Sequence, residues 1–130
     1  MVLLFSCDTQ GLFVSCNDCT ETEPSEVKVK IIFDPFQEGM YKEPEINVYE
    51  GNIDDGLLLK KYTPDSSPTE ISVYINKKYT VSATYYYYGK IVIAIDSATP
   101  RVRFESDQCD KPCYFVYDKE VDLTLKYHVS

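Results

Sequence analysis

The stretch VKVKIIF (27–33) decides the fold class. Its apolar side chains at positions 27, 29, 31 and 33 share one face of an extended chain, and Lys28 and Lys30 lie on the other, because strand residues alternate between faces. A period of two recurs along the chain, with turn-forming clusters between the segments. The sequence therefore predicts an all-β fold, an antiparallel β-sandwich of about 7–9 strands. Further strands are expected in PEINVYEG (44–51), GLLLKKYT (56–63), ISVYI (71–75), KKYTVSATYYYY (77–88), KIVIAID (90–96), PRVRFES (100–106), CYFVY (113–117) and EVDLTLKYHV (120–129).

Length and composition are those of a globular protein with one domain, residues 27–130, preceded by a polar segment. The 130 residues are 44% hydrophobic and 26% charged, and they include 12 Tyr and no Trp. The net charge of −8 argues against a nucleic-acid partner, whose phosphates it would repel. No run of about 18 apolar residues is present, so we expect no helix that spans a membrane.

The order of three strand segments resembles the prealbumin-like sandwich domains. These segments are Pro-x-Ile-x-Val-Tyr (44–49), Leu-x-Lys-Lys-x-Thr (58–63) and Tyr-Thr-Val-x-Ala (79–83). The relevant modules are the carboxypeptidase regulatory-like and collagen-adhesin B-type domains, and the likeness covers residues 27–83. The Asp-x-x-Gly turn common in those modules is replaced by Pro-Asp-Ser-Ser-Pro (64–68). The chain also resembles small cell-envelope lipoproteins of Bacteroidetes. The resemblance implies a prealbumin-like or immunoglobulin-like sandwich that serves as a scaffold, spacer or adhesive module.

The first residues are interpreted as the end of an export signal. MVLLFSC (1–7) ends in Leu-Phe-Ser-Cys, which is similar to a bacterial lipobox with Cys7 as the lipid-bearing residue. The basic start and the 7–15-residue apolar stretch of a signal peptide are not present before it. Phe-Val-Ser-Cys (13–16), ending in Cys16, is a second candidate with a shorter apolar run. The polar, acidic stretch NDCTETEPSE (17–26) suits a tether, so residues 1–26 are interpreted as a signal remnant and tether.

Four further cysteines form two close pairs, Cys16/Cys19 and Cys109/Cys113. Such spacings can hold a structural zinc ion, but the pairs are far apart and no His is near either. A redox dithiol would need a helix that activates its nucleophile, and none is predicted. Two disulfides in an exported protein fit the even count that remains once Cys7 carries lipid. We favour cross-pairing between the two motifs, because closing a loop of roughly 90–100 residues stabilises by more than about 4 kcal/mol in the chain-entropy model.

The run Tyr85-Tyr86-Tyr87-Tyr88 is the candidate binding surface. Strand alternation puts Tyr85 and Tyr87 in the core and turns Tyr86 and Tyr88 to solvent, where tyrosine suits protein or glycan contact. Ordinary packing of tyrosines across a solvated sheet is the alternative. Tyr49, Tyr62 and Tyr74 are also expected to point outward.

No pattern predicts an enzyme. The acidic turn 52–56 lacks the ligand spacing of a calcium loop, and the lone His128 has no partner nucleophile placed by the sequence. We therefore expect a non-enzymatic, lipid-anchored, extracytoplasmic envelope domain that binds or spaces something at a bacterial surface, with no cofactor or metal. The alternative is a zinc-binding or redox protein that uses the Cys16/Cys19 and Cys109/Cys113 pairs.

Overall fold

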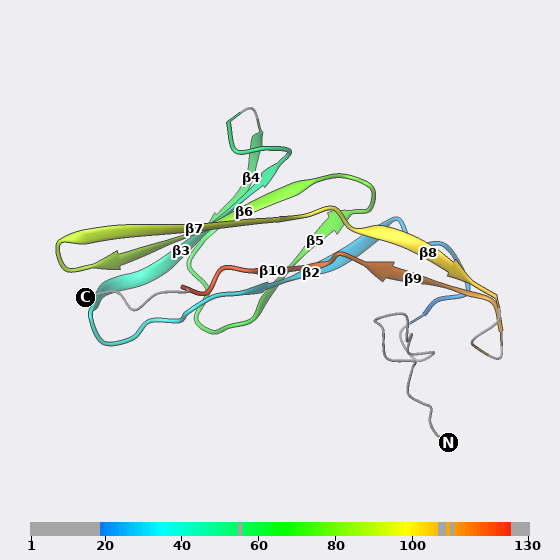
Figure 1. The fold of residues 1–130 in the computed structure, drawn as a ribbon, viewed down its shortest axis with the longest axis horizontal. Coiled ribbons are helices and arrows are strands. Elements are labelled where there is room, and N and C mark those ends of the chain that lie inside the picture. Colours follow the sequence, from blue (N-terminus) through cyan, green and yellow to red (C-terminus); the bar gives the residue numbers. More distant parts are fainter. Residues whose placement is uncertain (1–18, 55, 107–108, 110, 126–130) are drawn as a thin grey trace, which may run out of the picture.

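A computed structural model describes residues 19–54, 56–106, 109 and 111–125. Cys7, Cys16, Asp55 and His128 lie outside these residues. The described part contains nine strands and no helix, which confirms the prediction of an all-β chain. The strands are β2 (Glu26–Ile32), β3 (Met40–Glu50), β4 (Leu57–Tyr62), β5 (Thr69–Tyr74), β6 (Tyr79–Tyr87), β7 (Lys90–Ala98), β8 (Arg101–Glu105), β9 (Cys113–Tyr117) and β10 (Glu120–Asp122) (Figure 1).

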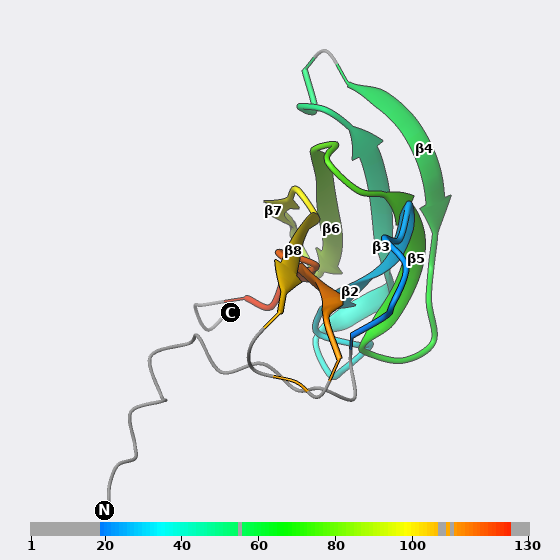
Figure 2. The ribbon, with the colours of Figure 1, turned by 90° about the vertical axis from the view of Figure 1, so that its right-hand side faces the viewer.

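The strands form three sheets. One has the order β4-β3-β6-β7, a second has the order β10-β2-β5, and β8 pairs with β9. The β8–β9 ribbon extends beyond one end of the two larger sheets (Figure 1). Figure 2, seen from that end, shows β4 and β7 on opposite sides of the fold, as the two edges of the four-stranded sheet.

One pairing departs from the predicted antiparallel arrangement. β10 pairs with β2 in parallel, with Val121 opposite Ile31. Backbone hydrogen bonds from Lys30 N to Lys119 O and from Leu123 N to Ile32 O flank this pairing. Alternation of side chains specifies the face that a residue occupies but not the direction of its neighbour, so the sequence could not show this exception.

The core lies between the two larger sheets, as the alternation in 27–33 predicts. Val29, Ile31 and Phe33 are at most 2% exposed, and Ile46 and Val48 on β3 are equally buried. Residues of both sheets belong to one hydrophobic cluster, an arrangement consistent with a β-sandwich. Its buried members are Val29, Ile31, Phe33, Met40, Ile46, Val48, Ile71, Val73, Tyr79, Val81, Ala83, Tyr85, Tyr87, Ala98, Val121 and Leu123.

Two buried tyrosines of β6 link the larger sheets through their hydroxyl groups. The Tyr85 hydroxyl donates to Leu123 O at 2.6 Å and accepts from Asp34 N at 3.0 Å. The Tyr79 hydroxyl accepts from Tyr74 N, at the end of β5, also at 3.0 Å. A buried phenol needs such partners, because an unpaired polar group away from water costs free energy.

Several strand boundaries differ from the prediction. β3 begins at Met40 instead of Pro44, and β7 runs to Ala98, so the following turn starts at Thr99. β10 ends at Asp122, three residues into the strand expected over 120–129.

Tyr62 was expected to point outward, but it packs partly buried against the core. Its hydroxyl hydrogen-bonds with Thr69 Oγ1 at 3.3 Å.

Candidate functional site

The tyrosine run of β6 divides between core and surface as the alternation predicts. Tyr85 is 0% exposed and Tyr87 is 8% exposed, whereas Tyr86 is half-buried and Tyr88 is 77% exposed. Tyr88 owes its exposure to a turn, since β6 ends at Tyr87 and β7 begins at Lys90. The burial of Tyr85 and Tyr87 and the exposure of Tyr88 agree with the prediction, although Tyr88 lies in a turn, and Tyr86 lies on the outer face only partly exposed.

A third tyrosine, from the neighbouring strand β3, joins this surface. The ring of Tyr41 lies 5.8 Å from that of Tyr86, edge-on, and 6.0 Å from that of Tyr88. Lys42 Nζ lies 4.2 Å from the centre of the Tyr86 ring, a distance typical of a cation–π contact. We call Tyr41, Lys42, Tyr86 and Tyr88 the aromatic surface.

Sequence reasoning missed Tyr41 because β3 was expected to start after it. Lys42 pairs with Tyr86 across the ladder, and the register shifts on both sides of that pair. These irregularities disturb strict alternation and turn Tyr41, Lys42 and Glu43 all outward. Tyr41 precedes Lys42, which pairs with Tyr86, so Tyr41 could have been found only if the register between the two strands had been known.

Acidic groups lie beside the aromatic surface. Burial is the main cause that raises the pKa of Tyr86, followed by the negative charge of Glu45 and the neighbouring Tyr41. A shallow depression of about 460 Å³ lies next to it, lined by Lys42, Glu43 and Glu45 together with Phe36 and Thr63. The surface thus combines exposed rings with charges of both signs, which suits a polar partner that also offers apolar area.

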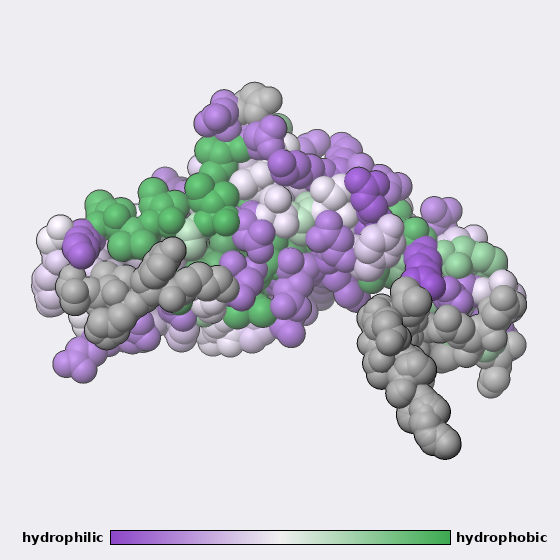
Figure 3. Space-filling view, in the orientation of Figure 1, coloured by the Kyte–Doolittle hydropathy of each residue, from purple (hydrophilic) through white to green (hydrophobic). Residues whose placement is uncertain are grey.

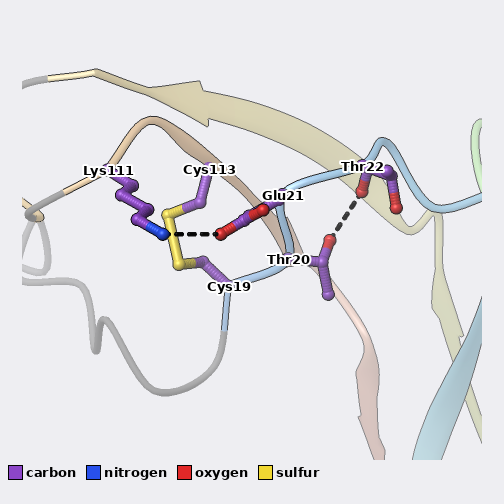
Figure 4. Close-up of a disulfide and its surroundings, with 6 residues drawn as sticks. All are labelled: Cys19, Thr20, Glu21, Thr22, Lys111 and Cys113. Carbon is purple, nitrogen blue, oxygen red and sulfur yellow. Dashed lines mark hydrogen bonds and ion pairs between the residues drawn. A yellow bond between two sulfur atoms is a disulfide. The ribbon is translucent and has the colours of Figure 1, made fainter.

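A second feature is the disulfide between Cys19 and Cys113 (Figure 4). Its Cα atoms are 5.6 Å apart and its cysteines are 94 residues apart in sequence. Thr20 forms a bridge with Tyr114 through two backbone hydrogen bonds of 3.0 and 2.8 Å. Glu21 lies 3.7 Å from Lys111 Nζ, as an exposed ion pair. The cross-pairing favoured from the sequence is therefore present for these two cysteines, and we call the Cys19–Cys113 disulfide the staple.

The sulfur of Cys109 lies close to this disulfide. The Sγ atoms of Cys19, Cys109 and Cys113 all lie within 4.8 Å of one another. Cys109 is itself disulfide-bonded, and Cys16 lies outside the described residues. The prediction that the segment containing Cys16 and Cys19 is joined to the loop 109–113 is thus shown directly for Cys19 alone.

The remaining predicted features are only partly described. In the acidic turn 52–56, Lys78 Nζ donates to Asn52 Oδ1 at 2.6 Å, and Asp54 is exposed. The Lys78 ammonium group therefore occupies the Asn52 oxygen that a calcium ion in this turn would need as a ligand. His128 lies outside the described residues.

Comparison with known proteins identifies no relative. No protein family, curated protein or solved structure matches the chain. The described residues include no helix long and apolar enough to cross a bilayer.

Proposed function

We propose that this chain is a non-enzymatic, extracytoplasmic lipoprotein domain, anchored through Cys7, that acts as a binding, adhesive or spacer module at a bacterial surface. The observation that carries the proposal is the Cys19–Cys113 disulfide. Disulfides persist in oxidising compartments such as the periplasm and the cell surface, and they are rare in the cytosol. Small Bacteroidetes lipoproteins are the class that the sequence resembles.

The staple gives the anchor a mechanical role. Cys19 is tied to Cys113, and Thr20 is tied to Tyr114, so the free arm would run only from Cys7 to Cys19. An extended arm of that length spans at most about 40 Å. The arm would therefore hold the domain close to the membrane with the β8–β9 end nearest to it.

The sheet arrangement supports the finer assignment to a prealbumin-like or immunoglobulin-like sandwich. The core lies between a four-stranded and a three-stranded sheet, the division found in seven-stranded immunoglobulin-type sandwiches. The segment order 44–49, 58–63 and 79–83 falls on β3, β4 and β6, which are neighbours in one sheet. Such a fold serves many functions, so the function must come from the surface it presents.

The aromatic surface is the proposed contact for a protein or glycan partner. Tyr88 and Tyr41 are 77% and 49% exposed, and rigid tyrosine rings supply contact area at a small cost in conformational entropy. The charge of Lys42 within this surface and the charge of Glu45 beside it would orient a polar partner.

Anchoring is tested by fractionating host cells that express the full-length gene product. Cys7→Ala should move the protein from the membrane to the soluble fraction, and Cys16→Ala should leave it in the membrane. Release by Cys16→Ala alone would assign the lipid to the other cysteine. Membrane partition unchanged in both variants would remove the lipoprotein assignment.

Binding is tested on glycan and protein arrays with the purified chain. The double variant Tyr86→Ala/Tyr88→Ala should lose whatever signal the wild type shows, and Tyr74→Ala, an exposed tyrosine on the other larger sheet, should keep it. Signals that survive the double variant, or a wild type that binds nothing, would contradict the assignment of this surface.

A second candidate function is zinc binding or redox chemistry by the cysteines. The Cys19, Cys109 and Cys113 sulfurs lie within 4.8 Å of one another, and this candidate requires that the same cysteines be reduced, since thiolates ligate a tetrahedral zinc ion. Native mass spectrometry separates the candidates. Loss of the thiol protons without added metal mass supports disulfides, whereas a retained zinc mass supports the second candidate.

A further inference from the structure

Strand β7 is an edge of the four-stranded sheet. It pairs with β6 along its whole length, from Lys90 opposite Tyr87 to Ala98 opposite Tyr79. On its other side it pairs with no strand of the described part of the chain. Near its end β7 lies close to β10, and Asp96 Oδ2 accepts a hydrogen bond from Asp122 N at 2.9 Å. This contact involves the side chain of Asp96, and β10 forms no backbone ladder with β7.

The turn geometry shows which backbone groups face this edge. The loop between β6 and β7 has two residues, and Tyr87 and Lys90 are the pair that closes it. In such a hairpin the closing pair is hydrogen-bonded, and every second pair after it is hydrogen-bonded as well. The N–H and C=O groups of Ile91, Ile93 and Ile95 therefore point away from β6, toward the edge.

The same three isoleucines are exposed on the outer face of the sheet. Ile91, Ile93 and Ile95 are 60%, 57% and 59% exposed, while Val92 and Ala94 pack partly buried against the core. Hydrophobic residues gather over β7 on the face shown in Figure 3. β-Branched apolar residues along an unpaired edge are a template for another strand.

Both edges of the sheet expose apolar side chains, with Leu57, Leu58 and Leu59 exposed on β4, but only β4 also carries charges and a bulge. β4 carries Lys60 and Lys61, and the β3–β4 ladder has a register shift between Val48 and Tyr49. Charges and bulges at an edge are the usual means of preventing strand addition. From 91 to 95, β7 has no charge, Gly or Pro, and its ladder with β6 has no register shift.

The sequence of β7 is complementary to itself. In an antiparallel pairing of two copies centred on Ile93, Ile91 of one copy faces Ile95 of the other, and the edge-facing backbone groups of both strands meet. Lys90 of one copy then faces Asp96 of the other, so each end of the pairing brings together opposite charges. A shift of the register in either direction separates these charges.

We propose that β7 pairs antiparallel with β7 of a second copy of this chain, about a two-fold axis at Ile93. The two four-stranded sheets become one continuous sheet, with the isoleucines of both copies as a single apolar stripe on its outer face. A two-fold contact of this kind closes on itself and stops at a dimer. The proposal goes beyond the function proposed above and does not rest on the lipid anchor or on the aromatic surface.

The experiment is sedimentation velocity of the full chain over a series of protein concentrations. The chain carries Cys7→Ser, so that a thiol at this position cannot cross-link two copies. We expect a reversible monomer–dimer equilibrium. Ile93→Lys puts two like charges together at the axis and should weaken the dimer by at least about 100-fold. Because Ile93 is exposed, the variant should keep its fold, which far-UV circular dichroism checks. The matched control is Leu58→Lys on β4, at a residue 48% exposed, and it should leave the dimer unchanged.

The charges test the register. Lys90→Glu should weaken the dimer, because it places two carboxylates opposite each other at both ends of the pairing, whereas Lys90→Arg should keep it. A chain that stays monomeric up to about 1 mM, or a dimer that survives Ile93→Lys, would overturn the proposal. A dimer lost in Leu58→Lys but kept in Ile93→Lys would move the interface to β4 and overturn it too.

Discussion

The hydroxyl group of Tyr85 donates a 2.6 Å hydrogen bond to the carbonyl of Leu123, 38 residues further along the chain. The same oxygen accepts a hydrogen bond from Asp34 N. One phenol in the four-stranded sheet thereby holds the segment that follows β2 and the segment that follows β10. Tyr85 is a structural residue, and its neighbour Tyr86 is a surface residue, because β6 turns them to opposite faces.

Substitutions of this pair should differ strongly in their effect on stability. Tyr85→Ala removes a buried ring and should lower the free energy of unfolding by about 3–5 kcal/mol. Tyr85→Phe keeps the ring but leaves Asp34 N and Leu123 O without their partner, which should cost roughly 1–3 kcal/mol. Tyr86→Ala should cost much less. Urea unfolding measures all three, and a Tyr86→Ala cost equal to that of Tyr85→Ala would contradict the assignment.

The stability of the domain should fall as the pH rises above about 10, where a free tyrosine ionises. Burial is the main cause that raises the pKa of Tyr85, and the hydrogen bond from Asp34 N opposes it in part. The unfolded chain therefore releases the Tyr85 proton at a lower pH than the folded chain does. Because the folded state then binds more protons, the stability that is present below pH 10 is lost as the pH rises toward the raised pKa.

Tyr85→Phe should flatten this pH dependence, since the substituted ring cannot ionise. Tyr88→Phe, at the exposed position, should retain the slope of the wild type. Urea unfolding between pH 8 and 11 gives the two slopes, and equal slopes for wild type and Tyr85→Phe would show that Tyr85 does not cause the dependence.

The Cys19–Cys113 staple should stabilise the domain without being needed for its fold. It closes a long loop, and removing such a bond typically costs about 2–4 kcal/mol. Cys19→Ser/Cys113→Ser should therefore lower the thermal midpoint clearly while the far-UV signal of the strands persists at room temperature. Lys111→Ala, which removes only an exposed ion pair with Glu21, should change stability by less than about 0.5 kcal/mol. A midpoint that falls with a chelator but not with a reductant would favour zinc.

The sequence predicted the features that depend on local alternation. Residues 27–33 and the run 85–88 have the burial that a period of two requires, because each strand has one face on the core. The isoleucines of β7 were not assigned to a face, since an unbroken apolar run such as IVIAI carries no period. Their exposure became visible only with the register to β6.

Apart from the cysteine pairing, the features that join distant segments could not be predicted from the sequence. The parallel pairing of β10 with β2 joins residues about 90 positions apart, and nothing local to either strand specifies its direction. Tyr41 was missed because the ladder between β3 and β6 shifts register on both sides of Lys42. The cysteine pairing was favoured from the loop length and from the even number of cysteines that remains once Cys7 carries lipid. The Cys19–Cys113 bond agrees with it.

Mass spectrometry of non-reduced proteolytic peptides, from protein purified from host membranes, tests the proposal of an anchored and stapled envelope domain most directly. The proposal predicts a peptide that begins at Cys7 and carries lipid, together with a disulfide-linked pair of peptides containing Cys19 and Cys113. A peptide that runs through Ser6 into an unmodified Cys7, or Cys19 and Cys113 recovered as free thiols, would contradict it.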